Sequence, residues 1–284
     1  MKITNDKQRD AIRPAGRPGH WIRAITLVMA LILLFLGTSL DDIHPAFAID
    51  VAVSSQNKVL TQEQDIAKDK TESTLLEAAE IPAAHTIEEF PDLLQTPELP
   101  TGCEITALTM LLRYYGLPAE KTTMAEAYLP KTSFRLKEDE DGNSYGPDIN
   151  RYFVGDPFTE TGIVCGPGAI ARAANQYLRD SGSPLRASAR TGVSFEELYR
   201  MVSEDKPVVV WVTICMEDRW ETQGWTTKNG SEVVWSQNDH AAVLVGYTET
   251  TITVSDPISG RREHDKSQFE SVFSSRGCSC VLVE

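Results

Sequence analysis

Apolar and polar positions divide the chain into three stretches. An apolar run from Ala24 to Leu36, continuing weakly to Leu40, follows an N-terminus that carries six basic residues. Residues 49–90 are mostly polar, and from about Pro91 the mixture of apolar and polar positions is that of a folded protein. A basic segment followed by an apolar run is typical of an export signal. The pattern therefore predicts a signal peptide or signal anchor over 1–48, a polar stalk over 49–90 and one folded domain over 91–284.

The N-terminal segment leaves two alternatives open. Ala46-Phe47-Ala48 has the small-x-small spacing of a cleavage site, which favours a cleaved signal peptide. An apolar run of about 17 residues is at the short end of what spans a bilayer, so residues 24–40 could instead remain as a membrane tether. In both cases we expect the rest of the chain to be secreted, or anchored to the outer face of the cell membrane.

Within the folded domain, the spacing of apolar residues predicts helices first and strands after. A helical period covers 102–115, a short stretch from about 123, 168–179, 195–204 and 267–274. Continuous apolar or alternating runs predict strands over 207–214, 240–247, 250–255 and 280–283. Helices followed by strands indicate an α+β fold in which N-terminal helices pack on a mostly antiparallel sheet.

Charge and motif content exclude several classes of function. Lys and Arg total 27 against 41 Asp and Glu, so the net charge is −14 and we expect no nucleic-acid partner. No phosphate-binding glycine motif and no paired Cys and His spacing of a zinc site occurs, so we expect neither cofactor nor metal. The chain has five cysteines, and this odd number leaves at least one thiol free or paired with another molecule.

Cys103 is the first candidate for chemistry. It lies in Thr101-Gly102-Cys103-Glu104, where Thr101 and Glu104 have capping-box spacing before an apolar helical run. With Thr101 as the N-cap, Cys103 is the second residue of the helix, near free N–H groups and the positive end of the helix dipole. That environment lowers a thiol pKa and favours a nucleophile, whereas the alternative is a small apolar residue packed under the first turn.

A thiolate nucleophile needs a base, and His240 is the candidate. We expect His85 and His264 to lie in solvated segments, whereas His240 starts an apolar strand 137 residues after Cys103. This agrees with the spacing of about 130–150 residues typical of a papain-like cysteine and histidine. The alternative is a structural histidine at a strand end.

Asp256 and Gln95 complete the candidate site. A hairpin centred on residue 248 places His240 directly opposite Asp256, which could then orient the imidazole. Asp256 also begins Asp-Pro-Ile-Ser-Gly, an ordinary turn sequence, and both interpretations can hold together. Gln95 is the one Gln or Asn between the stalk and Cys103, so it is the candidate second oxyanion donor beside the Cys103 N–H.

Several motifs together resemble the bacterial C39-like peptidases. The resemblance covers roughly 90–284 and is carried, in order, by Pro97 through Glu104, Tyr114-Tyr115-Gly116, Tyr152 through Pro157, the strand 207–214, and His240 through Gly246 leading to Asp256-Pro257. It implies a papain-like cysteine peptidase fold with Cys103 as nucleophile, His240 as general base and Asp256 as orienting residue. It also implies an upstream Gln as oxyanion donor, which falls on Gln95, although the bacteriocin-processing relatives place that Gln nearer the cysteine, where Pro97 stands here.

These observations predict an exported, monomeric cysteine peptidase that acts on a peptide or protein through a thioester acyl-enzyme. Two alternatives stay open. The same three side chains could serve a cell-wall amidase or an acyl transferase, or the scaffold could be a non-catalytic binding module on the cell surface.

Overall fold

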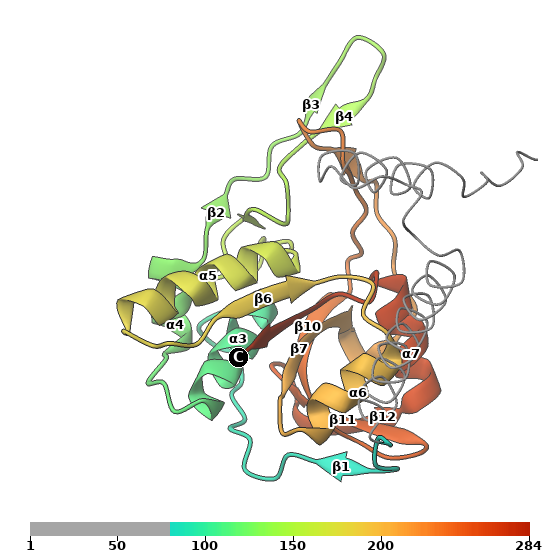
Figure 1. The fold of residues 1–284 in the computed structure, drawn as a ribbon. Coiled ribbons are helices and arrows are strands. Elements are labelled where there is room, and N and C mark those ends of the chain that lie inside the picture. The colour runs from blue at the N-terminus through green and yellow to red at the C-terminus, as the bar shows by residue number, and fades with distance from the viewer. Residues whose placement is uncertain (1–79) are drawn as a thin grey trace, which may run out of the picture. The chain divides into compact units, whose positions relative to one another are not determined.

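The computed structural model of this chain describes residues 80–284 (Figure 1). The predicted signal segment 1–48 and most of the predicted stalk lie outside the described residues. Within 80–284, no helix combines the length and apolar character needed to cross a membrane.

The centre of the described part is a seven-stranded sheet. Six of its strands follow the order β12-β11-β10-β7-β13-β6, and β1 pairs with β10 at its C-terminal end. Every pairing within this sheet is antiparallel, as predicted. The strands are β1 (His85–Thr86), β6 (Ala187–Arg190), β7 (Val208–Thr213), β10 (Asp239–Tyr247), β11 (Thr251–Asp256), β12 (Gly260–Asp265) and β13 (Cys280–Val283).

Helices cover both faces of this sheet, with α3 and α5 on one side and α6 and α7 on the other (Figure 1). All six residues of β7 are buried for this reason, which explains their continuous apolar run. The helices are α3 (Cys103–Tyr114), α4 (Lys121–Thr123) continuing into the π-helical turn Met124–Tyr128, α5 (Pro167–Asp180), α6 (Phe195–Ser203) and α7 (Lys266–Ser275), with a 3-10 turn at Ile214–Met216. The predicted α+β fold of N-terminal helices on a mostly antiparallel sheet is confirmed.

Local signals in the sequence predicted the C-terminal end of α3 and the N-terminal end of α6. Gly116 follows α3 with a φ of 77°, a conformation that glycine adopts without strain, so the helix ends there as predicted. The Ser194 side chain accepts a hydrogen bond from the Glu197 N–H and caps α6, again as predicted.

A smaller four-stranded sheet extends away from the main body (Figure 1). We call residues 131–152 and 217–238 the arm, because both segments lead out of the body and pair in the order β3-β4-β8-β9. These strands are β3 (Lys137–Glu138), β4 (Ser144–Tyr145), β8 (Trp225–Thr226) and β9 (Glu232–Val233), and β2 (Lys131–Thr132) pairs with β5 (Phe153–Val154) at the base. Trp225 is buried and packs on Phe134 with ring centroids 5.6 Å apart, which gives the arm its own small core.

Two segments that were predicted from the sequence to be exposed to solvent contribute strands to the main sheet. Residues 80–90, assigned by composition to the stalk, contribute β1 and the buried side chains of Ile87 and Phe90. His85, expected to be solvated, bonds to Asp205 at 2.8 Å. His264, expected in a surface loop, lies in β12, an edge strand whose charged side chains suit an exposed sheet edge.

Candidate active site

Cys103 is the first residue of α3, and Gly102 is the N-cap. The predicted cap was wrong, because the Thr101 hydroxyl donates instead to the Thr159 carbonyl at 2.9 Å and no side chain caps the helix. The chain is tightly packed at this point, since a Cβ on Gly102 would lie 2.8 Å from the Cβ of Leu99. The first-turn N–H groups, including that of Cys103, have no acceptor within the helix.

Glu104 does not complete a capping box either. Its side chain is buried, and its two carboxyl oxygens have separate partners. The Cys103 thiol donates to Oε2 at 3.3 Å, and the backbone N–H of Cys165 donates to Oε1 at 2.9 Å. The carboxyl therefore joins the start of α3 to the loop before α5, and it touches the sulfur that the sequence singled out.

This environment shifts the pKa of both groups. Burial raises the pKa of the Glu104 carboxyl. Burial and then the charge of Glu104 raise the pKa of the Cys103 thiol well above its ordinary value, against a hydrogen bond from the Ala241 N–H that lowers it. The sequence predicted a lowered thiol pKa from the helix dipole, and in this structure that prediction is wrong because desolvation and a neighbouring carboxylate outweigh the helix end.

His240 and Asp256 form a buried pair. His240 Nε2 lies 2.9 Å from Asp256 Oδ2, while the second ring nitrogen, Nδ1, is buried with no hydrogen-bond partner among the described residues. Asp256 Oδ1 accepts from the backbone N–H groups of Ile258 and Ser259. Burial acts to raise the pKa of Asp256, but His240 and these two N–H groups lower it to about 2. The carboxylate is thus fixed on both oxygens, and it both holds His240 and starts the turn.

The pairing that brings these two residues together differs from the predicted one. Val243 lies opposite Ser255, so the same register places Asp256 opposite Ala242 rather than opposite His240. His240 and Asp256 are diagonal neighbours two positions apart on one face, and the imidazole reaches the carboxylate across that diagonal. The predicted contact is present, and the predicted register was wrong by two residues.

Gln95 is also buried, in the loop that leads to Cys103. Its Nε2 donates to the Pro100 carbonyl at 2.7 Å, and its Oε1 is buried without a hydrogen-bond partner among residues 80–284. The carboxamide therefore fixes the segment from 95 to 100, and one of its two amide protons makes no hydrogen bond within residues 80–284.

The structure brings Cys103, His240 and Asp256 into one region. The Cys103 sulfur accepts a hydrogen bond from the Ala241 N–H, and Ala241 directly follows His240. The charge of Asp256 raises the pKa of Cys103, and the charge of His240 lowers the pKa of Glu104. The thiol is hydrogen-bonded to Glu104, and no hydrogen bond between Cys103 and His240 is formed within the described part of the chain. Cys103 keeps 8% of its surface exposed.

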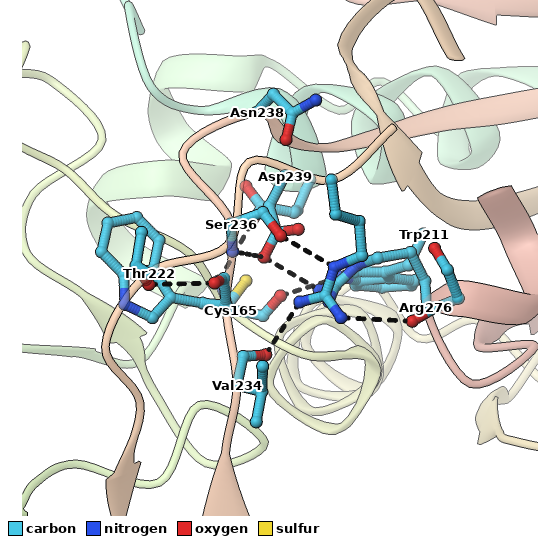
Figure 2. Close-up of polar contacts among 12 residues, drawn as sticks. Cys165, Trp211, Thr222, Val234, Ser236, Asn238, Asp239 and Arg276 are labelled. Carbon is cyan, nitrogen blue, oxygen red and sulfur yellow. Dashed lines mark hydrogen bonds and ion pairs between the residues drawn. The ribbon is translucent and has the colours of Figure 1, made fainter. Parts of the chain in front are cut away.

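A polar cluster that the sequence did not single out fixes the start of β10 (Figure 2). The Asp239 carboxylate accepts from the Ser236 N–H at 3.1 Å and forms an ion pair with Arg276 at 3.0 Å, with both charged side chains almost fully buried. Arg219 donates to the Ser236 hydroxyl at 2.7 Å. Trp211 donates to the Cys165 carbonyl at 2.8 Å, which ties β7 to the loop that contacts Glu104. Because Asp239 precedes His240, this cluster holds the backbone at the residue directly before the histidine.

Metal-ligating groups are not gathered in this region. Among residues 80–284, no group of three or more His, Cys, Asp and Glu side chains could hold a metal ion. The five cysteines, all within these residues, are free thiols.

Comparisons with known proteins identify the family. The model described as Peptidase_C39 like family matches residues 87–281. The uncharacterized protein YvpB of Bacillus subtilis (strain 168) is 30% identical over 196 residues, which are 67% of this chain and 72% of YvpB. A crystal structure from Bacillus anthracis, assigned as a C39-like peptidase, has a TM-score of 0.62 at 28% identity and covers 72% of this chain and 98% of that one.

A more distant structure is xylellain, a cysteine protease from Xylella fastidiosa, with a TM-score of 0.39 at 11% identity over 72% of this chain and 87% of that one. That likeness is too low to support an argument about function. The family match and the two Bacillus relatives are sufficient, and this chain belongs to the C39-like peptidase family.

Proposed function

We propose that this protein is a cysteine peptidase in which Cys103 is the nucleophile, His240 the general base and Asp256 the residue that orients it. The observation that carries the proposal is the state of the His240 ring. One nitrogen is held by a buried carboxylate, and the other is buried with no hydrogen-bond partner within residues 80–284. The next residue of the strand is Ala241, whose N–H bonds the Cys103 sulfur. An imidazole fixed in this way can accept a proton only at Nδ1.

The proposed reaction begins when the thiol leaves Glu104 and gives its proton to His240 Nδ1. The thiolate attacks the carbonyl carbon of the substrate, a C–S bond forms, and the carbonyl oxygen becomes an oxyanion. The Cys103 N–H and the remaining amide proton of Gln95 are the proposed donors to that oxyanion. The imidazolium then protonates the leaving amine as the C–N bond breaks, which leaves a thioester acyl-enzyme.

Hydrolysis uses the same groups in reverse. His240 accepts a proton from water, the water oxygen attacks the thioester, and the thiol regains its proton when the acid product leaves. Asp256, with its pKa of about 2, remains ionised throughout and stabilises the imidazolium without accepting its proton.

The site of action and the partners are part of the proposal. The basic and apolar pattern of residues 1–40 supports export, with the folded part acting outside the cell or at the outer face of its membrane. We expect a monomer that takes peptide or protein substrates.

Labelling with a thiol-directed acylating probe tests the proposal. In a protein whose accessible thiols Cys215 and Cys278 are replaced by Ser, the probe should modify Cys103, as mapped by mass spectrometry. Adding Cys103→Ala should abolish both labelling and peptide hydrolysis while the protein stays folded. The protein with only these two Ser replacements is the matched control and should keep both labelling and hydrolysis, because it lacks two free thiols that the proposed reaction does not use. An inert Cys103 would favour a binding module, and product analysis on peptides and cell-wall fragments separates a peptidase from an amidase or acyl transferase.

A further inference from the structure

The base of the arm holds a groove of about 480 Å³ whose charge is opposite to that of the whole chain. Four basic residues and two tyrosines are prominent in its lining: Arg135, Lys137, Arg151, Lys228, Tyr145 and Tyr152. One acidic residue, Asp148, lines it as well. In a chain with a net charge of −14, four cations around one acidic residue reverse the local sign.

The four cations are exposed side chains. None forms an ion pair with any residue in 80–284, and Arg151 only packs over the Tyr152 ring at 5.9 Å. The arm also carries an acidic run at 138–141, but this run lies in and beside the β3–β4 turn and does not line the groove. The groove therefore presents free positive charge to solvent.

The groove is connected to the loop before the candidate nucleophile. A neighbouring cavity of about 580 Å³ shares Thr132 and Ser133 with it and is also lined by Asp156 and Thr159. Thr159 accepts the hydrogen bond from Thr101, two residues before Cys103. An extended chain lying in the groove could thus continue along the shared residues toward α3.

We propose that this groove binds an acidic segment of the polypeptide substrate and so selects which peptides reach Cys103. The inference rests on the proposed peptidase function for its biological meaning, but the binding itself does not require catalysis. Arg guanidinium groups pair with carboxylates through two parallel hydrogen bonds, and the tyrosine rings offer apolar surface to the aliphatic stems of Glu side chains. Carboxylates spaced along a peptide can pair one by one with the separate cations of this groove, so an acidic peptide is the proposed occupant.

Fluorescence anisotropy with a labelled Glu-rich decapeptide, and with the same peptide carrying Gln in place of Glu, tests the proposal. The full chain carrying Cys103→Ala binds without turnover, so a negative result here is independent of whether Cys103 is a nucleophile. We expect the Glu peptide to bind at least about tenfold more tightly than the Gln peptide, with affinity falling as salt is raised.

Charge reversal locates the binding. Lys137→Glu with Lys228→Glu should weaken binding of the Glu peptide by about tenfold, since each exposed pair contributes up to about fivefold and reversal adds repulsion. The matched control is Arg172→Glu with Arg262→Glu, which makes the same change in net charge at two exposed positions outside the groove and should change affinity by less than about twofold. Equal losses in both variants, equal binding of both peptides, or binding of polyphosphate but not of the Glu peptide would each overturn the proposal.

Discussion

Removing the charge of Glu104 should make the Cys103 thiol more acidic. Glu104→Gln keeps the shape of the side chain and an oxygen that can still accept the Cys165 N–H. It removes the carboxylate that lies 3.3 Å from the sulfur and that raises the pKa of the thiol. We therefore expect the thiolate of the variant to form at lower pH than that of the wild-type protein.

The size of the effect follows from the distance. Two unit charges 3.3 Å apart interact by about 5 kcal/mol at an effective dielectric constant of about 20. Since one pKa unit corresponds to about 1.4 kcal/mol, the upper limit is about three to four units. Burial of the thiol, the largest cause of its raised pKa, is left unchanged by the substitution. We expect the midpoint of thiol ionisation to fall by at least about one unit.

The rate of alkylation by iodoacetamide as a function of pH measures this midpoint, because only the thiolate reacts. Cys215 is exposed and Cys278 is half-buried, so both are replaced by Ser in every protein compared. Glu120→Gln is the matched control, since Glu120 is exposed and pairs with Arg113 near the far end of α3. A midpoint in Glu104→Gln that is unchanged or higher, while Glu120→Gln behaves like the parent protein, would refute the electrostatic reasoning.

Three other substitutions give separable results. Asp256→Asn should lower kcat at least about a hundredfold. The ionised Asp256 also contributes about 2 kcal/mol to the unfolding free energy of the parent above pH 4, and this contribution is lost as the pH falls from 4 to 2. Urea unfolding should show that the variant lacks this contribution. Gln95→Ala should lower kcat by about 10²–10³-fold with little change in KM, as measured by steady-state kinetics. Arg276→Met should lower the unfolding free energy by about 3–5 kcal/mol, because the buried Asp239 charge loses its partner, and adding Asp239→Asn should restore much of the loss.

Most of the main sheet and its helices could be predicted because their apolar residues repeat with a clear period. The strand 208–213 is buried on both faces and reads as one apolar run. The edge strand Gly260–Asp265 could not be found in the same way, since one side of it is solvated and Arg261 through His264 are charged or polar. The short arm strands are two residues each, below the length at which a period can be recognised.

The predicted site residues could be chosen from residue types and spacing, but their environment could not. Glu104 was expected to bond the backbone of the first helical turn, and the capping pattern gave no indication that it contacts the thiol instead. Its burial depends on the loop around Cys165, 61 residues away in the chain. Arg276 and Asp239 likewise meet through folding alone, and no local pattern links them.

The contact between His240 and Asp256 depends on one extra residue in β10. From the turn, Tyr247 pairs with Ile252 and Gly246 with Thr253, a register that would continue to place Asp256 opposite Val243. Side chains at 240 and 243 point to opposite faces, so the imidazole and the carboxylate would be separated by the sheet. The register shifts at Val245, a β-bulge, and brings Ala242 opposite Asp256, so that His240 and Asp256 share a face. A bulge inside an apolar run does not change the pattern of apolar residues. The sequence therefore identified His240 and Asp256 as candidates but did not predict the bulge at Val245 that places them on one face.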